Sequence, residues 1–351
     1  MRTDNPKVFI IILNWNGLKD TLECLESVYK LEYSNFEVIV VDNGSTDNPA
    51  NIIRNTFPTV VLIENQENLG YTGGNNVGMR HAMARDAEYV WLLNNDTVVE
   101  SSSLKKLVLA SEKSSDIGLV TPILYYYDKP DQLQSFGGVV VWKENQIISF
   151  KRLKDIPSTK SDNRMTICLW GTALLIKKDV IDNVGYLNND FFAYWEDADY
   201  SVRTASKGYR NILEPKAVIH HKTPLPMPGT VSRSPHYFYY MVRNECIFWK
   251  IYLRRLRRLR YLKDYLGKSI AVAASCRDRG SEECADACLD GMWCALWGVS
   301  GIWDKKIKMP RVIKTFILWH PYVLSSLLKG NIRVIILEFL KRTKFKIMKT
   351  S

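Results

Sequence analysis

The N-terminal part of the sequence alternates short apolar runs with segments of helical periodicity, and this alternation restricts the possible folds more than any other feature. The apolar runs are Val8–Leu13, Phe36–Val41, Val60–Ile63 and Tyr89–Leu93. Between the first two, Leu18–Leu31 spaces its leucines as one face of a helix. Strands that alternate with helices in this way pair in parallel through right-handed crossovers. The pattern predicts an α/β fold with a mainly parallel central sheet flanked by helices.

The alternation continues, with one interruption, to about residue 236. The interruption, Tyr125–Pro157, holds two short β-like runs between charged turns, which predicts a hairpin-like excursion. The other predicted elements are helices at Ala50–Thr56, Val77–Arg85 and Ser102–Ser111 and within Phe191–Gly208, and strands at Leu119–Thr121, Thr166–Ile176 and Val218–His221. We interpret residues 1–236 as one domain.

The last third of the sequence differs from the rest in charge. Residues 1–240 contain 25 Lys and Arg against 28 Asp and Glu, a net charge of −3, whereas residues 241–351 contain 23 against 9, a net charge of +14. Arginines alternate with Leu253, Leu256, Leu259 and Leu262. This predicts a helical region, 237–351, whose basic amphipathic helix and later apolar segments such as Ile332–Leu340 bind an anionic membrane surface. Nucleic acid is the less favoured partner, because the arginines form no groove-reading motif.

Cysteine usage and hydropathy indicate the compartment. Seven cysteines without a signal-peptide pattern predict a reduced, cytoplasmic protein. The longest apolar stretches, Leu289–Trp303 and Val312–Leu328, are interrupted, so neither reaches the roughly 18 apolar residues of a spanning helix. We expect peripheral attachment to the cytoplasmic face of the membrane. Buried thiols are favoured over a zinc site because no C-x-x-C pair occurs among Cys276, Cys284, Cys288 and Cys294.

Two carboxylates directly follow predicted core strands. Asp96 ends the run Tyr89–Leu93 after two asparagines, and Asp42 ends Phe36–Val41. Ligands of open α/β sheets bind outside the carboxyl ends of the strands. Asp96 is therefore a candidate for holding a metal or a phosphate-bearing ligand, and Asp42 for accepting from a nucleobase or ribose. The alternative for both is a simple Asn/Asp turn.

A cluster of glycines lies between the third and fourth predicted strands. Gly70, Gly73 and Gly74 predict a loop whose backbone can approach a ligand closely. The dinucleotide-binding fingerprint needs its glycines directly after the first strand, where this chain has Asn14-Trp15-Asn16-Gly17. A nicotinamide-dependent enzyme is therefore disfavoured.

Three carboxylates follow an aromatic segment further along the chain. Glu196, Asp197 and Asp199 come directly after Phe191–Trp195. Crowding and desolvation should raise the pKa of at least one of these acids, which suits a general base. The alternative is a solvated acidic start of a helix.

Two successive histidines, His220 and His221, end the last predicted strand. Together with Asp96, one of them could ligate a divalent metal whose shell is completed by phosphate oxygens. A structural histidine is the alternative.

In this order, the motifs resemble those of the inverting family-2 glycosyltransferases with the glycosyltransferase-A fold, in particular the rhamnosyltransferase-like branch. The matching motifs, between Val8 and about Lys305, are Ile11–Asn16, Val40–Asp47, Asn68–Asn76, Leu92–Asp96, Gly171–Ala173, Phe191–Asp199 and His220-His221. The ordered set is more specific than any single motif. The resemblance implies a nucleotide-binding half at about 1–122 and an acceptor half at about 123–236.

The resemblance also implies roles for individual residues. Leu13, Trp15 and Asp42 would hold the base and ribose of a nucleotide-sugar donor. Further nucleotide contacts are expected from Asn14, Gly73, Asn76 and Asn95. Donor and acceptor contacts are expected from Trp170, Gly171, Thr172, Trp195, Asp199 and Arg243, the last neutralising leaving-group phosphate.

The expected cofactor is Mg²⁺ or Mn²⁺. Asp96 stands at the last position of the family's D-x-D motif, where it would bind the metal on the donor diphosphate. This chain has Asn94 at the first position of that motif. A histidine would supply a further ligand, and of the two candidates we prefer His220 to His221.

Asp197, beside Glu196, matches the family's catalytic base. The implied reaction is inverting transfer of a sugar, with dTDP-rhamnose or a UDP-sugar favoured as donor, to a carbohydrate or lipid-linked glycan. A nucleotidyltransferase with a similar sheet is the alternative enzyme. The other alternative is a non-catalytic protein that binds membranes or nucleic acid.

Overall fold

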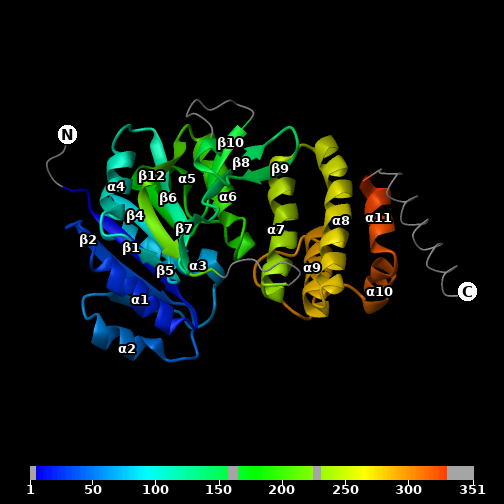
Figure 1. Ribbon diagram of the computed structural model, residues 1–351, viewed down its shortest axis with the longest axis horizontal. Coiled ribbons are helices and arrows are strands. Elements are labelled where there is room, and N and C mark those ends of the chain that lie inside the picture. Colours follow the sequence, from blue (N-terminus) through cyan, green and yellow to red (C-terminus); the bar gives the residue numbers. More distant parts are fainter. Residues whose placement is uncertain (1–4, 157–164, 224–230, 330–351) are drawn as a thin grey trace, which may run out of the picture. The chain divides into compact units, whose positions relative to one another are not determined.

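The computed structural model describes residues 5–156, 165–223 and 231–329 (Figure 1). The chain folds as two compact units, Met1–Leu225 and Pro226–Ser351. The first unit is built around β-sheet, and the described part of the second unit is helical.

The first half of the large sheet is parallel. Its strands, in the order β3-β2-β1-β4, are β3 (Val61–Glu64), β2 (Phe36–Asp42), β1 (Val8–Asn14) and β4 (Tyr89–Asn94). The connecting helices are α1 (Leu18–Val28), α2 (Pro49–Thr56) and α3 (Gly70–Met83). The register aligns Asn14 with Asp42 and Leu13 with Asn94, so the polar strand ends meet at one edge. The predicted parallel arrangement is confirmed for this half.

Beyond β4 the sheet is mixed. Its further strands are β11 (Ala173–Lys177), β6 (Ile117–Tyr126), β12 (Arg210–His221), β5 (Thr97–Val99) and β7 (Lys129–Leu133). The first of these runs antiparallel to β4 because the chain enters it at the carboxyl end of β4, where Ala173 pairs with Leu93. β12 is parallel to β6 and antiparallel to β5.

The predicted strand Thr166–Ile176 is two strands in two sheets. β10 (Met165–Leu169) pairs with β8 (Gly137–Val141), which pairs with β9 (Gln146–Ser149) in a separate antiparallel sheet. The hairpin predicted within Tyr125–Pro157 is thereby confirmed. The strand prediction is wrong at Trp170–Thr172, where a turn moves the chain into the large sheet.

The glycines expected in a loop lie instead in the first turns of α3, which begins at Gly70. Glycine ordinarily weakens a helix, but here it permits close packing. A Cβ at Gly74 would lie 2.3 Å from Leu13 Cδ1, and one at Gly78 would lie 2.6 Å from Ile11 Cγ2. α3 therefore rests directly on β1.

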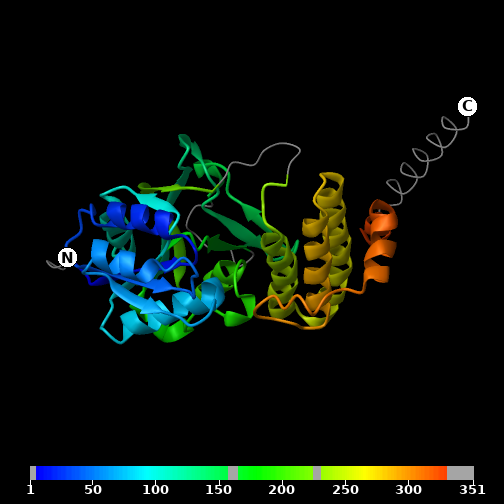
Figure 2. The same ribbon diagram turned by 90° about the horizontal axis from the view of Figure 1, so that it is seen from below.

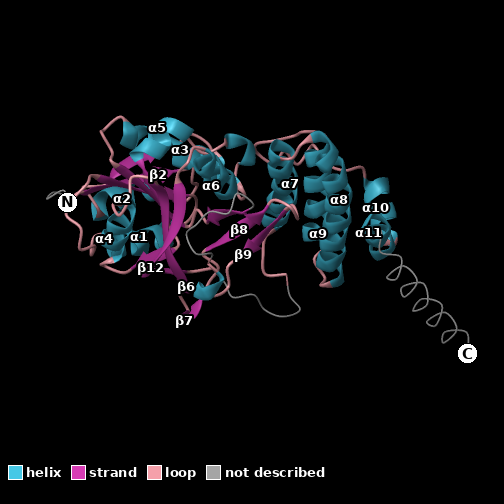
Figure 3. Cartoon of the chain, turned by 90° about the horizontal axis from the view of Figure 1, so that it is seen from above, coloured by secondary structure: helices cyan, strands magenta, loops and turns pink. Residues whose placement is uncertain are grey.

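Helices cover both faces of the large sheet (Figure 3). α1, α2 and α4 (Ser103–Ser111) pack on the face of β1 that carries Val8 and Ile10. The opposite face, with Phe9 and Ile11, is covered by α3, α5 (Lys178–Val184) and α6 (Glu196–Ser206). Two short 3₁₀ turns, η1 (Leu153–Asp155) and η2 (Asn189–Phe191), complete the described elements of this unit.

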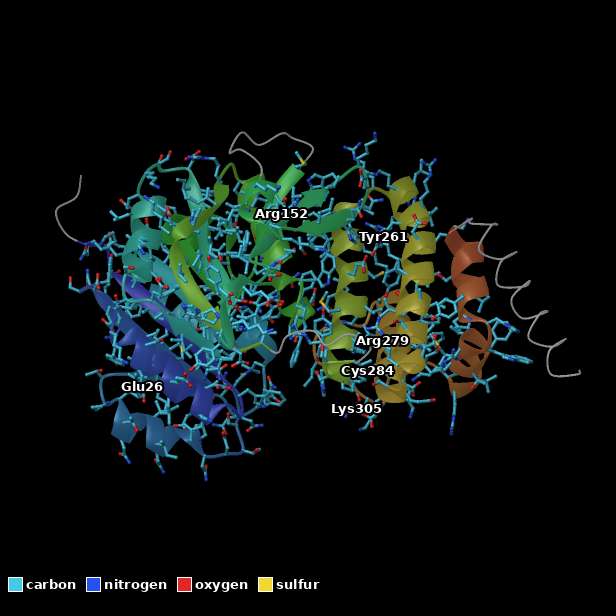
Figure 4. All side chains as sticks on the ribbon, viewed as in Figure 1. Glu26, Arg152, Tyr261, Arg279, Cys284 and Lys305 are labelled. Carbon is cyan, nitrogen blue, oxygen red and sulfur yellow. The ribbon has the colours of Figure 1, made fainter. Side chains whose placement is uncertain are left out.

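The helices of the second unit pack against one another (Figure 2). The helices are α7 (Pro235–Tyr252), α8 (Arg255–Asp278), α9 (Glu282–Leu296), α10 (Arg311–Trp319) and α11 (Pro321–Lys329). The Tyr261 ring lies 5.9 Å from the rings of both Trp249 and Tyr265 (Figure 4 labels Tyr261). Among the described residues, no helix combines the length and apolar character needed to span a bilayer.

The Leu/Arg stretch does not form one continuous amphipathic helix. Leu253 follows α7 and is buried, whereas Leu256 and Leu259, in the first turns of α8, are 80% and 67% exposed. The helix predicted over Leu253–Leu262 is thus broken at Arg254, which precedes α8. All seven cysteines lie within the described residues as free, buried thiols.

Candidate functional site

Asp96 lies in the tight turn that joins β4 to β5. Thr97 Oγ1 donates to the Asn94 carbonyl over 2.6 Å and closes this turn. Asn95 Nδ2 donates to Thr21 Oγ1 over 3.0 Å and ties the turn to α1. Asp96 therefore lies at the carboxyl edge of the sheet, while the Asn95 amide supports the turn itself.

The pairing of β5 with β12 brings His221 to Asp96. His221 lies opposite Thr97 in this pair, and Lys222 N donates to Asp96 O over 2.9 Å. His221 Nε2 is then 3.1 Å from Asp96 Oδ1. Burial alone would raise the pKa of Asp96, but nearby His221 and the charge of Lys222 together lower it.

The surroundings of His221 suit a metal ligand. Its Nδ1 lies 2.8 Å from Gln134 Oε1, and Thr223 Oγ1 lies 3.1 Å from both ring nitrogens. When His221 is neutral with its ring proton on Nδ1, the lone pair of Nε2 is available to a cation beside Asp96 Oδ1. That oxygen is buried, and no donor in residues 5–156, 165–223 and 231–329 is aligned to hydrogen-bond it. An imidazole nitrogen and a carboxylate oxygen so disposed fit a divalent cation.

His220 points away from this pair. Successive residues of a strand face opposite sides of the sheet, and His220 Nε2 lies 3.7 Å from Glu100 Oε1. Its ring lies 6.1 Å from that of Tyr125. The geometry favours His221 as the partner of Asp96, the reverse of our preference from sequence.

The ends of β1 and β2 form a hydrogen-bonded polar edge. Asn14 Nδ2 donates to Asp42 Oδ1 over 2.9 Å and to Ser45 Oγ over 3.1 Å. Ser45 Oγ also donates to Asp42 Oδ1. Leu13 is half-buried here, and Trp15 is 53% exposed beside the edge. An exposed aromatic ring next to a held carboxylate can stack on a base while the acid accepts from a sugar or base N–H or O–H.

Two residues predicted to contact the nucleotide have structural roles. Asn76 is buried: its Nδ2 donates to Leu187 O and Asn189 Oδ1, both over 2.9 Å, and its Oδ1 accepts from Leu187 N. Gly73 is also buried and packs against Leu69 of its own helix. Both residues hold α3 in place, and neither exposes a group to a ligand.

The backbone before α6 is strained. Phe192 has φ 63° and ψ −56°, and Ala193 N donates to Phe191 O over 2.7 Å, which makes a γ-turn of the rare positive-φ form. Tyr194 and Trp195 also have positive φ, at 66° and 74°. Such conformations persist only where the surroundings fix them, and they cluster at functional sites.

The start of α3 fixes this strained segment. Thr72 N donates to Phe192 O over 3.1 Å, and Thr72 Oγ1 lies 3.4 Å from the same oxygen. Gly70 has φ +73°, and a Cβ there would lie 2.5 Å from Phe192 O. Glycine at position 70 therefore permits both the backbone turn and the close approach.

Glu196 and Asp197 open α6 in different environments. Glu196 is 4% exposed, and its Oε2 has no hydrogen-bond partner among the described residues. Asp197 is half-buried, and its carboxylate accepts from Gly171 N over 3.0 Å and from Ala198 N over 2.8 Å. Burial raises the pKa of both, and for Glu196 the charge of Asp197 raises it further. Asp197 is the accessible carboxylate of the pair.

The turn at Gly171 connects several parts of the site. Its N–H holds Asp197, and its carbonyl accepts from Tyr71 Oη over 2.6 Å. The next carbonyl, of Thr172, accepts from Asn94 N over 2.9 Å. Trp170 Nε1 donates to Ser135 Oγ over 2.9 Å on the other side. The turn thus links the end of β4, the start of α3 and the start of α6.

Asp199 and Arg243 do not fit the donor or acceptor roles predicted for them. Asp199 is buried and forms a 2.8 Å ion pair with Arg203, one turn later in α6. Arg243 is fully buried, lies over the rings of Tyr239 and Tyr240, and donates to a backbone carbonyl of its own unit. Sequence spacing could not distinguish these buried charges from exposed ones. We correct both predictions.

Sequence reasoning missed several residues of the site. Tyr71 lies within the glycine motif, which we interpreted from the sequence only as a backbone that can approach a ligand closely. Gln134 directly follows β7, lies far from any motif and carried no signal. Lys222 lies between Asp20 and Glu23, at 2.7 and 2.6 Å, and holds the end of β12 against α1. Its position directly after the two histidines was a usable hint.

These features define a class of protein. The large sheet has a parallel half with polar strand ends, and β11 joins it to a mixed half. An acidic helix start follows in the mixed half. This combination is the glycosyltransferase-A fold. Residues 9–185 match the model of glycosyl transferase family 2, and the chain belongs to that family. It is a glycosyltransferase.

Similar proteins are known from archaea and bacteria. The low-salt glycan biosynthesis hexosyltransferase Agl10 of Haloferax volcanii is 24% identical over 257 residues, 72% of this chain and 78% of that protein. The N-acetylglucosaminyl-diphospho-decaprenol L-rhamnosyltransferase of Mycobacterium tuberculosis is 27% identical over 206 residues, 53% of this chain and 66% of that protein. The crystal structure of S. aureus TarS 1-349 in complex with UDP-GlcNAc has a TM-score of 0.56 at 16% identity, covering 94% of this chain and 88% of that one. This last similarity concerns the fold alone.

Proposed function

We propose that the protein transfers a sugar, with inversion, from a nucleotide-diphosphate-sugar to a hydroxyl group of a carbohydrate or lipid-linked glycan. The observation that carries this proposal is the accessible carboxylate of Asp197, held by two peptide N–H groups. The charges of Asp197, Glu196 and Asp96 all act on Tyr71, so the base candidate and the strand-end acid lie around one side chain. This arrangement supports a proton acceptor near the proposed site for phosphate and metal.

The edge formed by β1 and β2 would bind the nucleoside of the donor. Asp42 would accept from ribose or base, Leu13 would line the site, and the exposed ring of Trp15 would stack on the base. The amide of Asn14 keeps the Asp42 carboxylate in place through the 2.9 Å bond between them.

Asp96 and His221 would hold Mg²⁺ or Mn²⁺. The described residues gather no set of three His, Cys, Asp or Glu side chains at one point, so donor phosphates and water would complete the shell. When bound, the cation stabilises negative charge on the diphosphate leaving group. Excess EDTA should abolish transfer and Mn²⁺ should restore it; unchanged transfer in EDTA would remove the metal from the proposal.

Asp197 would act as the general base. Its carboxylate takes the proton of the acceptor hydroxyl as that oxygen bonds to the anomeric carbon, while the bond to the nucleoside diphosphate breaks. The raised pKa of Asp197 strengthens it as a proton acceptor, provided the pH lies above that pKa. One displacement from the opposite face inverts the anomeric configuration.

The relatives support the substrate class. One is named a hexosyltransferase of glycan biosynthesis and another an L-rhamnosyltransferase whose acceptor is a sugar on diphospho-decaprenol. We therefore favour dTDP-rhamnose or a UDP-sugar as donor and a lipid-linked glycan as acceptor.

A donor panel tests the proposal. The protein is incubated with Mn²⁺, acceptor extracts and single nucleotide-sugars, and released nucleotide is identified by chromatography. We expect acceptor-dependent release of a nucleoside diphosphate from one donor. Release of pyrophosphate, with formation of a nucleotide-linked product, would instead indicate the alternative, a nucleotidyltransferase.

We also propose that the second unit attaches the enzyme to the cytoplasmic face of an anionic membrane. In α10 the buried side is polar and the exposed side is apolar. Lys314 is buried, and its Nζ lies 2.9 Å from Asp290 and 3.3 Å from Asp286. Three apolar residues on the opposite side of the helix are exposed. These are Val312, Phe316 and Trp319, which are 82%, 64% and 71% exposed.

Charge supports a lipid surface as the occupant of this face. Exposed basic residues precede and begin α10, namely Lys305, Lys306, Lys308 and, at the first position of the helix, Arg311. Basic residues near a bilayer are attracted to anionic lipid by about 1 kcal/mol each, and tryptophan suits the interface between headgroups and acyl chains. Leu256 and Leu259 of α8 are further exposed apolar residues of this unit. The predicted segment Ile332–Leu340 lies outside the described residues.

Vesicle flotation tests membrane attachment. The protein should float with vesicles containing phosphatidylserine at low salt and less at high salt. The double variant Phe316→Ser/Trp319→Ser should lose binding about tenfold or more, given the apolar area removed. Leu109→Ser is the matched control, because Leu109 is 57% exposed in the acidic first unit. Equal binding by all three proteins would contradict the proposal.

A further inference from the structure

Tyr71 occupies a position that its motif does not explain. It lies in the first turn of α3, yet its hydroxyl donates to Gly171 O over 2.6 Å, across 100 positions of sequence. Burial and the charges of Glu196, Asp197 and Asp96 raise the pKa of Tyr71 well above its ordinary value. The hydroxyl therefore keeps its proton and acts as a donor.

Gly171, whose carbonyl accepts the hydrogen bond from Tyr71, also contacts Asp197. Gly171 N donates to Asp197 Oδ2 over 3.0 Å, whereas Asp197 Oδ1 accepts from Ala198 N, its own neighbour in the chain. Among the described residues, Gly171 is thus the donor from outside α6 that hydrogen-bonds the Asp197 carboxylate. The orientation of the carboxylate depends on where Gly171 lies.

The contact between Tyr71 and Gly171 is tight. A Cβ on Gly171 would lie 2.8 Å from Tyr71 Oη and 3.3 Å from Cζ of the ring. The turn is also anchored by the bond from Asn94 N to Thr172 O and by that from Trp170 Nε1 to Ser135 Oγ, which involve the residues on either side of Gly171. The hydroxyl of Tyr71 therefore fixes the side of the turn that faces the base.

We propose that Tyr71 is a positioning residue for the base: through the Gly171 peptide groups it sets the direction of the Asp197 carboxylate. This inference rests on the proposed function of Asp197. A misdirected base costs turnover while donor binding is retained, because orientation is needed only as the acceptor hydroxyl reacts.

The test compares two tyrosine-to-phenylalanine variants. Tyr71→Phe removes the hydroxyl alone. Tyr33→Phe is the matched control, because the buried Tyr33 hydroxyl also donates to a backbone carbonyl, that of Pro6, over 2.6 Å, far from the site in sequence. For each variant, kcat and the donor KM are measured with the full chain, together with the dissociation constant of the nucleoside diphosphate and the melting temperature.

We expect kcat of Tyr71→Phe to fall about tenfold to a hundredfold, with donor KM and nucleotide affinity changed less than about twofold. Tyr33→Phe should lower the melting temperature by a similar amount and leave kcat unchanged. A normal kcat in Tyr71→Phe would overturn the inference. A rise in donor KM that matches the loss in kcat/KM would also overturn it, because Tyr71 would then act in donor binding.

A second variant approaches the same bond from the other side. Gly171→Ala forces a methyl group towards Tyr71 Oη and should also lower kcat. The same alanine should cost less in the Tyr71→Phe background, where the oxygen is gone. Equal costs in both backgrounds would contradict the coupling. Asp197→Asn, assayed in parallel, separates this inference from the proposed function: if that variant keeps full turnover, the base assignment fails, whatever Tyr71 does.

Discussion

Asp42, at the end of β2, and Glu196, at the start of α6, are held in opposite ways. Asp42 is buried with its carboxylate hydrogen-bonded by Asn14 and Ser45, and it lies on a regular parallel strand. Glu196 has a carboxylate oxygen with no partner in the described residues, and Asp197 beside it is half-exposed. A fully hydrogen-bonded carboxylate is suited to recognition. At the start of α6, burial raises the pKa of both Glu196 and Asp197, and a carboxylate with a raised pKa is suited to proton transfer.

The backbone segments that carry these acids also differ, because one is regular and the other is strained. β1 and β2 place their polar ends by strand register, which needs no strained residue. The segment before α6 has positive φ at Phe192, Tyr194 and Trp195, each costing about 1–3 kcal/mol. The energy is offset by packing and by the bonds from Thr72. The comparison suggests that this fold recognises its ligand on rigid strands and carries out its chemistry on a strained turn.

The largest effect should come from removing the base. Asp197→Asn keeps the shape and the acceptor for one peptide N–H, but it cannot take a proton. We expect transfer to fall by about 10²–10⁴-fold, with nucleoside diphosphate affinity unchanged in calorimetry. If Asp197→Asn turned over about as fast as the wild type, the start of α6 would not supply the base, and its proposed difference in role from the strand ends would be wrong.

A smaller effect, of a different kind, should follow from Asp42→Asn. Loss of a charged acceptor should weaken donor binding by about 1.5–3 kcal/mol, which is tenfold or more in donor KM. The value of kcat at saturating donor should change little, because the bond exists in the ground state as well. A fall in kcat without a change in KM would show that Asp42 acts in the chemistry.

The smallest effect should be on stability and should depend on pH. Burial raises the pKa of Glu196 in the folded state, so its stabilising contribution is present below the unfolded pKa, near 4.5, and is lost as pH rises through the folded pKa. Glu196→Gln does not titrate. Its melting temperature should exceed that of the wild type by about 2–4 °C at pH 8, as about 1 kcal/mol would give in a unit of this size.

The difference in melting temperature should shrink towards pH 4.5, where the wild-type carboxyl is protonated. Scanning calorimetry at several pH values measures it. A variant that is less stable than the wild type at pH 8 would show that the Glu196 carboxylate is compensated after all.

The sequence predicted the strand edge well because apolar runs and their polar ends are local signals. Asp42 and Asp96 lie where those runs end, and the parallel half of the sheet follows from the alternation. The glycine motif was misjudged as a loop, because the packing of Gly74 and Gly78 on β1 is a tertiary contact that helix propensity does not contain. The break at Gly171 was missed for the same reason.

Side-chain partners were less predictable than elements. The choice between His220 and His221 depends on which face of β12 meets Asp96, and this follows from pairing with β5, a strand of three residues. Arg243 looked like a free cation in the sequence, yet it is buried in the second unit. Tyr71 acquires its role only when α3 and the Gly171 turn come together.

The most direct measurement is the anomeric configuration of the first product formed. Transfer is run with an identified donor, and the new glycosidic bond is assigned by nuclear magnetic resonance before any slow rearrangement. A single displacement with Asp197 as base predicts that every product bond is inverted relative to the donor. Retention of the donor configuration would contradict this account, because it requires two displacements or attack from the face of the leaving group.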